Sequence, residues 1–263
     1  MNDLNAASVD DVTAFFKTYY APNNAILAIA GDVQTDTTLT RVRRHFESIP
    51  AQPPPPPVDV NQPPQERERR LTIEDPLARL PRVDIGYRIP STLSPDDDTI
   101  DVLAQILAGG RSGRFYEHIV RQQQRAVSVR AFAPNSRGPR LFGIEATPTP
   151  GTSLDVLEQA IYSEIDGVKA GPIAGAEIEK ARNSARRQFM GSLATSLALA
   201  RSLAEYGLFY GDPGRINTRW DRLAAFSATD VQRVAKQYFT PENRTVVISL
   251  PKPAAGAANG GAQ

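Results

Sequence analysis

Two stretches of the sequence, residues 8–24 and 227–243, match one another without a gap at an offset of 219 residues. Serine, aspartate, valine, lysine, tyrosine and proline recur at the same places in both. Such a repeat constrains the fold strongly, because both copies should form the same supersecondary unit in two related domains. In each copy a serine able to cap a helix precedes an aspartate in the first turn, which predicts a helix N-terminus. A proline then ends the helix, and apolar strands are predicted over residues 25–30 and 245–250.

The repeat also predicts the domain organisation. If each copy closes a domain, residues 1–50 are the C-terminal fragment of a first repeat, and residues 66–252 form a complete second repeat. Residues 51–65 form a proline-rich linker that should be stiff and extended, with a proline-rich ligand for a partner module as the alternative. The tail over residues 253–263, rich in glycine and alanine, is expected to be disordered.

Within the second repeat, hydrophobic periodicity predicts strands followed by a block of helices. This order indicates an α+β fold, in which a sheet is backed by a layer of helices. The predicted strands cover residues 82–89, 127–133, 141–147 and 245–250, and predicted helices cover residues 97–107, 114–124, 154–168 and 178–189.

Charge and residue usage exclude several classes of function. The chain of 263 residues carries 30 basic and 29 acidic residues along its length, so no overall field would hold nucleic acid. The absence of cysteine excludes disulfides, thiol catalysis and cysteine-based metal sites. No apolar run is long enough for a membrane span, and no signal peptide is expected in this sequence. The cellular compartment is left open.

Two segments, residues 11–32 and 103–121, resemble the pitrilysin/insulinase (M16) family of zinc metallopeptidases. The first looks like the close of that family's catalytic repeat, and the second is similar to the opening of its non-catalytic repeat. The resemblance implies an M16/LuxS-like fold, with one complete repeat preceded by a fragment. It also implies a peptide substrate and a zinc ion in the catalytic repeat, held by the inverted motif His-x-x-Glu-His. Full-length bacterial members can be periplasmic.

This sequence does not carry the zinc motif. Its two histidines, His45 and His118, lie far apart along the chain. Residues 114–118 would form the motif if Arg114 were a histidine, but a protonated guanidinium has no lone pair for a metal. We therefore predict no metal ligand and no catalytic residue here, and expect zinc in a missing catalytic repeat or a partner subunit. A degenerate metal site around Glu117 and His118 is the alternative, although no third ligand is evident.

One residue remains a candidate for substrate binding. The resemblance implies that the second repeat supplies an arginine and a tyrosine toward the substrate, and Arg121 matches the arginine. Val127 occupies the place of the tyrosine, and valine cannot donate a hydrogen bond. Arg121 is therefore predicted to bind a peptide carbonyl or carboxylate alone. A charge that complements the end of its helix is the alternative interpretation.

Two further patterns favour structural roles. The glycine-rich turn over residues 109–113 lacks the lysine and spacing of a phosphate-binding loop, so a tight turn is preferred. The carboxylates of Asp96, Asp97 and Asp98 could bind a cation, but their position after Pro95 is typical of a helix start.

These observations predict the non-catalytic, substrate-chamber half of an M16-type zinc metalloendopeptidase, inactive on its own. Its expected partner is a catalytic M16 repeat or subunit bearing His-x-x-Glu-His. A structural or assembly subunit, related to processing-peptidase or bc1 core proteins and without a peptidase role, is the alternative. An independent hydrolase would need an activity that survives chelators.

Overall fold

The computed structural model describes residues 2–252 and divides the chain into two compact units. The first comprises Met1–Val60 and Met190–Asn217, and the second comprises Asn61–Phe189 and Thr218–Gln263. The N-terminal segment of the first unit ends at Val60, inside the stretch predicted as a linker, and the domain boundaries drawn from the sequence stay a prediction. The predicted disordered tail lies outside the described residues.

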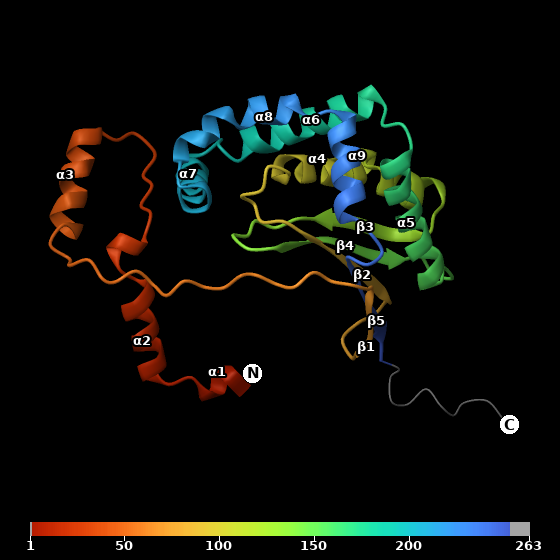
Figure 1. Cartoon of the computed structure of the whole chain (residues 1–263), viewed down its shortest axis with the longest axis horizontal. Coiled ribbons are helices and arrows are strands. Elements are labelled where there is room, and N and C mark those ends of the chain that lie inside the picture. The colour runs from red at the N-terminus through yellow and green to blue at the C-terminus, as the bar shows by residue number, and fades with distance from the viewer. Residues whose placement is uncertain (1, 253–263) are drawn as a thin grey trace. The chain divides into compact units, whose positions relative to one another are not determined.

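A five-stranded mixed sheet forms the centre of the second unit (Figure 1). Its strand order is β1-β5-β2-β4-β3; β1 runs parallel to β5, and the other neighbours are antiparallel. The predicted α+β architecture is confirmed. The strands are β1 (Arg69–Asp75), β2 (Arg82–Ile89), β3 (Ala126–Phe132), β4 (Arg140–Pro148) and β5 (Arg244–Pro251).

Helices lie on one side of this sheet (Figure 1). Strand β2 explains the arrangement, because its buried residues Val83, Ile85, Tyr87 and Ile89 alternate with more exposed ones, as expected when one face meets the core. The helices of this unit are α4 (Asp97–Ala108), the short 3₁₀ helix η2 (Gly110–Ser112), the π-helix η3 (Phe115–Gln122), α5 (Leu154–Ala170), most of α6 (Gly175–Gly191), α8 (Arg219–Ala225) and α9 (Ala228–Tyr238).

Helix α9 is fixed to the sheet through an aromatic residue that follows its last turn. The ring of Phe239 lies 4.7 Å from the ring centroids of both Tyr87 and Phe142, which belong to β2 and β4. All three side chains are fully buried. The contact joins the C-terminal helix to strands that are distant in sequence.

The first unit contains helices but no sheet within the described residues. Both copies of the sequence repeat begin with the predicted capping box: Ser8 pairs with Asp11, and Ser227 with Asp230. The predicted strand over residues 25–30 is wrong, because a strand requires a paired neighbour and no described residue pairs with this segment. The elements of this unit are α1 (Asn2–Ala6), α2 (Val9–Tyr19), η1 (Pro22–Asn24), α3 (Thr35–Phe46), α7 (Ser196–Tyr210) and most of η4 (Pro213–Thr218).

The burial of Phe239 predicts a large effect of its removal on stability. Phe239→Ala should lower the free energy of unfolding by about 3–5 kcal/mol, since it leaves a cavity between two buried rings. Urea denaturation followed by circular dichroism measures the change. Tyr20→Ala is the matched control, because Tyr20 stands at the equivalent place in the first copy and is exposed; it should cost less than about 1 kcal/mol. Equal losses for both variants would contradict the packing described here.

Candidate functional site

Arg121 and Val127 lie on consecutive elements of the second unit. Arg121 is in the last turn of η3, where its exposed side chain makes an ion pair with Glu117 one turn earlier. Val127 lies at the register shift between Ala126 and Ser128 that begins β3, and it is exposed. The chain passes between them through Gln124, whose φ of 52° is in the left-handed region. Both candidate residues are therefore accessible, but the cation of Arg121 already has a partner.

Arg114 stands where the inverted zinc motif would have its first histidine, and it serves as a structural anchor. Its Nε and Nη2 donate to the two carboxylate oxygens of Glu177 on α6 at 2.8 and 2.9 Å. Only 13% of the Arg114 side chain is exposed. The hydrogen bonds from Arg114 hold the pKa of the Glu177 carboxyl below its usual range. A bidentate pair of this kind fixes η3 against α6.

The other residues of this motif-like run also have partners of their own. The Nδ1 of His118 lies 2.7 Å from Oε2 of Glu164 on α5, and Glu117 accepts from Arg121. His45 lies far away in sequence on α3 of the first unit. Between residues 2 and 252, no three His, Cys, Asp or Glu side chains come together as a metal site would require. The residues present do not fit a zinc ion, because an arginine occupies a ligand position.

The aspartates at the start of α4 are each matched by an arginine. Burial raises the pKa of Asp101 to about 6, and the nearby charge of Asp97 adds to the effect. Arginine side chains therefore balance the charge of this cluster, which argues against the alternative of a site for a bound metal cation. The pairs are Asp96 with Arg233, Asp97 with Arg140, Asp98 with Arg222, and Asp101 with Arg219.

The raised pKa of Asp101 predicts a pH dependence of stability. Because the folded state binds this proton more tightly than the unfolded chain, the group contributes stability below about pH 4 that is lost as the pH rises through about 6. In the Asp101→Asn variant this part of the decline should disappear. Urea unfolding of both proteins between pH 4 and 7.5 measures it. The same decline in both proteins would show that another group is responsible.

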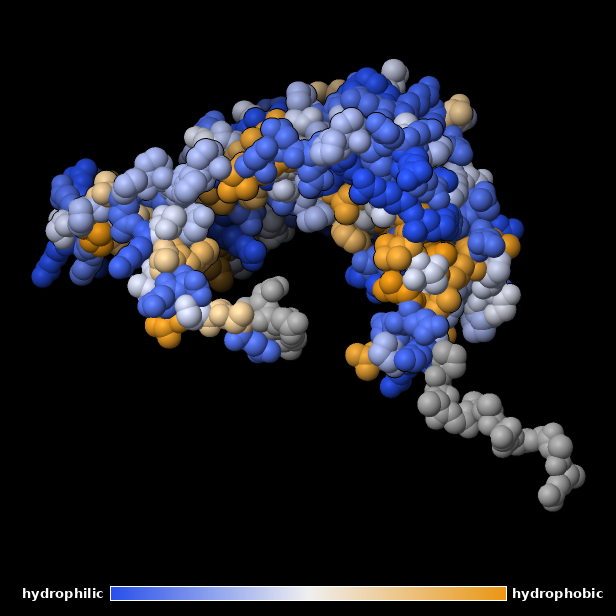
Figure 2. Space-filling view, turned by 60° about the horizontal axis from the view of Figure 1, so that its bottom comes forward, coloured by the Kyte–Doolittle hydropathy of each residue, from blue (hydrophilic) through white to orange (hydrophobic). Residues whose placement is uncertain are grey.

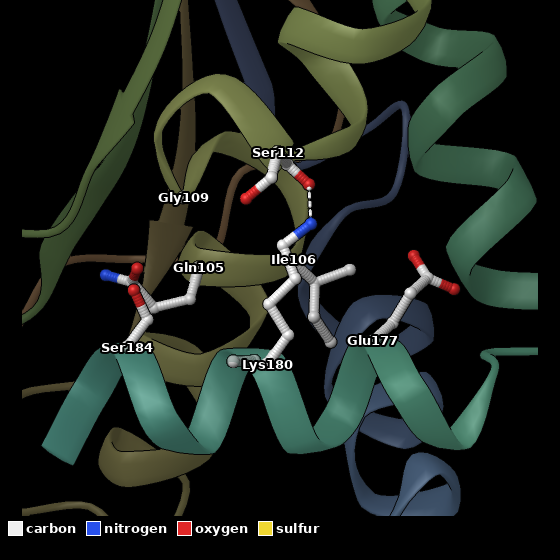
Figure 3. Close-up of a pocket in the computed structure, with 8 residues that line it drawn as sticks. Gln105, Ile106, Gly109, Ser112, Glu177, Lys180 and Ser184 are labelled. Atoms are coloured by element: carbon white, nitrogen blue, oxygen red, sulfur yellow. Dashed lines mark hydrogen bonds between the residues drawn. The ribbon is translucent and has the colours of Figure 1, made fainter.

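The glycine-rich turn before η3 forms a tight connection and not a phosphate cradle. A small pocket of about 20 Å³ lies between this turn and α6, lined by Gly109, Ser112 and Lys180 among others (Figure 3). This volume holds roughly one water molecule. Lys180 Nζ donates to the carbonyl oxygen of Ser112 at 2.5 Å, which closes the pocket. A Cβ at Gly113 would lie 2.6 Å from the backbone nitrogen of Gly109, so the turn requires glycine there.

The sheet has an open face, turned away from α5 and α9. The sequence analysis did not identify the residues that lie on it. Figure 2 shows hydrophobic residues gathered where the sheet side of the second unit comes forward. Two ion pairs, Arg82 with Asp84 and Arg130 with Glu145, lie along the strands among them. The alternation of buried and exposed residues in β2 could have indicated that Asp84 lies on this face. Strand β1 was not predicted, so its residues on this face could not be identified. The exposed apolar residues of this open sheet face are Leu71, Ile73, Phe132 and Leu141.

Comparisons with known proteins establish the class of this chain. It belongs to the family described as the Peptidase M16 inactive domain, whose model matches residues 6–185. This result confirms the resemblance found in the sequence. In the described range, no helix is both long and apolar enough to cross a membrane.

The individual relatives agree with this assignment. The zinc protease PqqE of Helicobacter pylori is 26% identical over 258 residues, which is 95% of this chain and 57% of that protein. A crystal structure of a protease from Helicobacter pylori superposes with a TM-score of 0.89 at 24% identity, over 95% of this chain and 61% of the other. The crystal structure of a peptidase M16 inactive domain from Pseudomonas fluorescens gives a TM-score of 0.79 at 16% identity. The match covers 95% of this chain and 58% of the other. The chain spans about half the length of the curated relatives it matches.

Proposed function

We propose that this chain is the non-catalytic, substrate-chamber half of an M16-type zinc metalloendopeptidase that cleaves peptides. The observation that carries the proposal is the open sheet face, which presents apolar side chains and arginine–carboxylate pairs together. A catalytic M16 repeat or subunit bearing His-x-x-Glu-His would hold the zinc ion and its water. This chain would supply binding surface and exclude solvent.

An extended peptide matches the chemistry of the open sheet face. Its apolar side chains would cover Leu71, Phe132 and Leu141, each of which is about half exposed. Complete burial of a side chain of this size contributes roughly 1.5–3 kcal/mol. The charges of the two ion pairs on this face balance, so neither acidic nor basic peptides would be repelled as a class.

Arg121 is the residue proposed to bind the substrate directly. Its side chain is 61% exposed, so it can exchange the carboxylate of Glu117 for a peptide carbonyl or carboxylate. Val127 provides no hydroxyl group beside it. The contact therefore depends on the guanidinium alone.

Arg121→Ala should raise the KM of the assembled peptidase roughly threefold to tenfold and leave kcat nearly unchanged, because one hydrogen-bonded contact to the substrate is lost. Steady-state hydrolysis of a fluorogenic peptide measures both constants. Arg201→Ala is the matched control, since Arg201 also pairs with a glutamate one turn away and is exposed, but lies on α7. If both variants raise KM alike, the proposed role of Arg121 is wrong.

The function itself is tested by reconstitution with a purified M16 subunit that bears His-x-x-Glu-His. The chain alone should not hydrolyse the peptide or hold stoichiometric zinc, and its addition should raise hydrolysis by the catalytic subunit at least tenfold. Metal analysis and peptide hydrolysis measure the two parts. An unchanged rate at saturating chain, stoichiometric zinc in the chain alone, or chelator-resistant activity of the chain would each refute the proposal.

The alternative of a structural or assembly subunit is favoured by the pairing of Arg121 with Glu117 and by the valine at position 127. These features leave few side chains that could bind a substrate specifically. Purification of the natural complex separates the two functions: an M16 catalytic subunit in it supports the peptidase, and a stable assembly without any peptidase supports the alternative.

A further inference from the structure

A turn with an uncommon backbone conformation separates Arg121 from β3. Helix η3 ends at Gln122, and Gln124, two residues later, has a φ of 52°. Glycine, and less often asparagine or aspartate, occupies this left-handed conformation after the end of a helix. Between residues 2 and 252, Gln124 is the one residue other than glycine with a positive φ. Glycine would suit the turn better, so the turn does not require the side chain of Gln124.

Hydrogen bonds from a neighbouring turn hold Gln124 in this conformation. Thr149, which follows β4, donates from Oγ1 to the carbonyl oxygen of Gln124 at 2.7 Å. Its backbone nitrogen donates to the carbonyl oxygen of Arg125 at 3.1 Å, and the backbone nitrogen of Arg125 donates to the carbonyl oxygen of Ile119 at 2.9 Å. The turn is thus fixed both to the end of β4 and to η3. Residues that the surrounding structure holds in a sparsely populated conformation cluster at functional sites.

The side chain of Gln124 is available to bind a ligand. The residue is exposed, and its carboxamide makes no hydrogen bond to any residue that the structure describes. A carboxamide carries two N–H donors and one carbonyl acceptor, so it can pair with a donor and an acceptor of a ligand at once. Gln124 therefore offers an uncharged hydrogen-bonding group close to the place where Val127 offers none.

Gln124 stands midway between Arg121 and Val127, three residues from each. Three residues of chain span at most about 11 Å, so Arg121 and Gln124 can contact the same short stretch of an extended peptide. At the start of β3, the register shift between Ala126 and Ser128 leaves Val127 out of the pairing with β4. Bulges of this kind often lie next to active sites, where they redirect a side chain. Two backbone irregularities thus fall within the candidate site.

We infer that Gln124 is a second substrate-binding residue, whose carboxamide pairs with the backbone of the peptide beside the group bound by Arg121. Its Nε2 donates to the carbonyl oxygen of one peptide residue, and its Oε1 accepts from the N–H of the same residue, as a paired strand would. Because both groups belong to the backbone, this contact suits extended peptides of varied sequence. The inference rests on the proposed function and adds the residue that takes the place of the missing tyrosine.

Steady-state hydrolysis of a fluorogenic peptide by the peptidase, reconstituted with the catalytic M16 subunit, tests the inference. Gln124→Gly should raise KM roughly threefold to tenfold and leave kcat nearly unchanged, since it removes the carboxamide from a backbone conformation that glycine favours. Its urea midpoint of unfolding should not fall. Gln122→Ala is the matched control, because Gln122 is also an exposed glutamine and adjoins Arg121 but has a helical backbone; it should leave KM nearly unchanged.

Substrates in which one amide is replaced by an ester identify the contact itself. Each ester lacks one N–H group, and the scissile bond stays an amide. At one position the ester should raise the KM of the wild-type complex and cause no further rise with Gln124→Gly, because both changes remove the same hydrogen bond. A rise in KM that came only from a disturbed turn would not depend on the position of the ester.

Gln124→Asn repeats the test should Gln124→Gly fail to fold. Asparagine also adopts the left-handed conformation, and its carboxamide is one methylene group shorter, so KM should rise here too. A wild-type KM for the variants of Gln124, an equal rise for Gln122→Ala, or a raised KM that accompanies a lower urea midpoint would overturn the role of Gln124 and leave the proposed function standing. Failure of the wild-type chain to raise hydrolysis by the catalytic subunit would refute the proposed function, and the inference with it.

Discussion

The second unit depends on the packing of Phe239 between Tyr87 and Phe142. This contact holds the C-terminal helix α9 on the sheet and allows the last strand, β5, to enter between β1 and β2. Among the described residues β1 lies at the edge of the sheet and pairs with β5, so the position of β1 depends on that of β5. The open face proposed for peptide binding belongs to the same sheet, which is therefore packed through a residue near the end of the described chain.

Most of the sheet could be predicted from local signals. Strand β2 has strict alternation, and the capping boxes mark the starts of α2 and α9, so these elements appeared in the sequence analysis. Strand β1 was missed because its charged residues obscure the apolar pattern; Arg70 faces α5 and pairs with Glu158 there. The apolar segment over residues 25–30 misled the prediction for the opposite reason, since strand composition alone supplies no pairing partner.

The candidate site was predictable only in part. The resemblance to a known family selected Arg121 and Val127 as candidate residues. Glu117 lies one turn before Arg121, and this spacing could have indicated the ion pair between Glu117 and Arg121. The neutralisation of Asp98 by Arg222 could not be read from the sequence, because 124 positions separate them. Long-range pairs of this kind decide whether a carboxylate cluster binds a cation or simply joins two helices.

Burial of the two copies of the capped helix need not depend on protein concentration in the same way. Burial of α9 is intramolecular, so its equilibrium is the same at every protein concentration. Burial of α2 by another polypeptide would be bimolecular, and its extent would follow the concentration and affinity of that partner. The same capped helix is therefore a buried part of the second unit in one copy and, among the described residues, an exposed apolar face in the other.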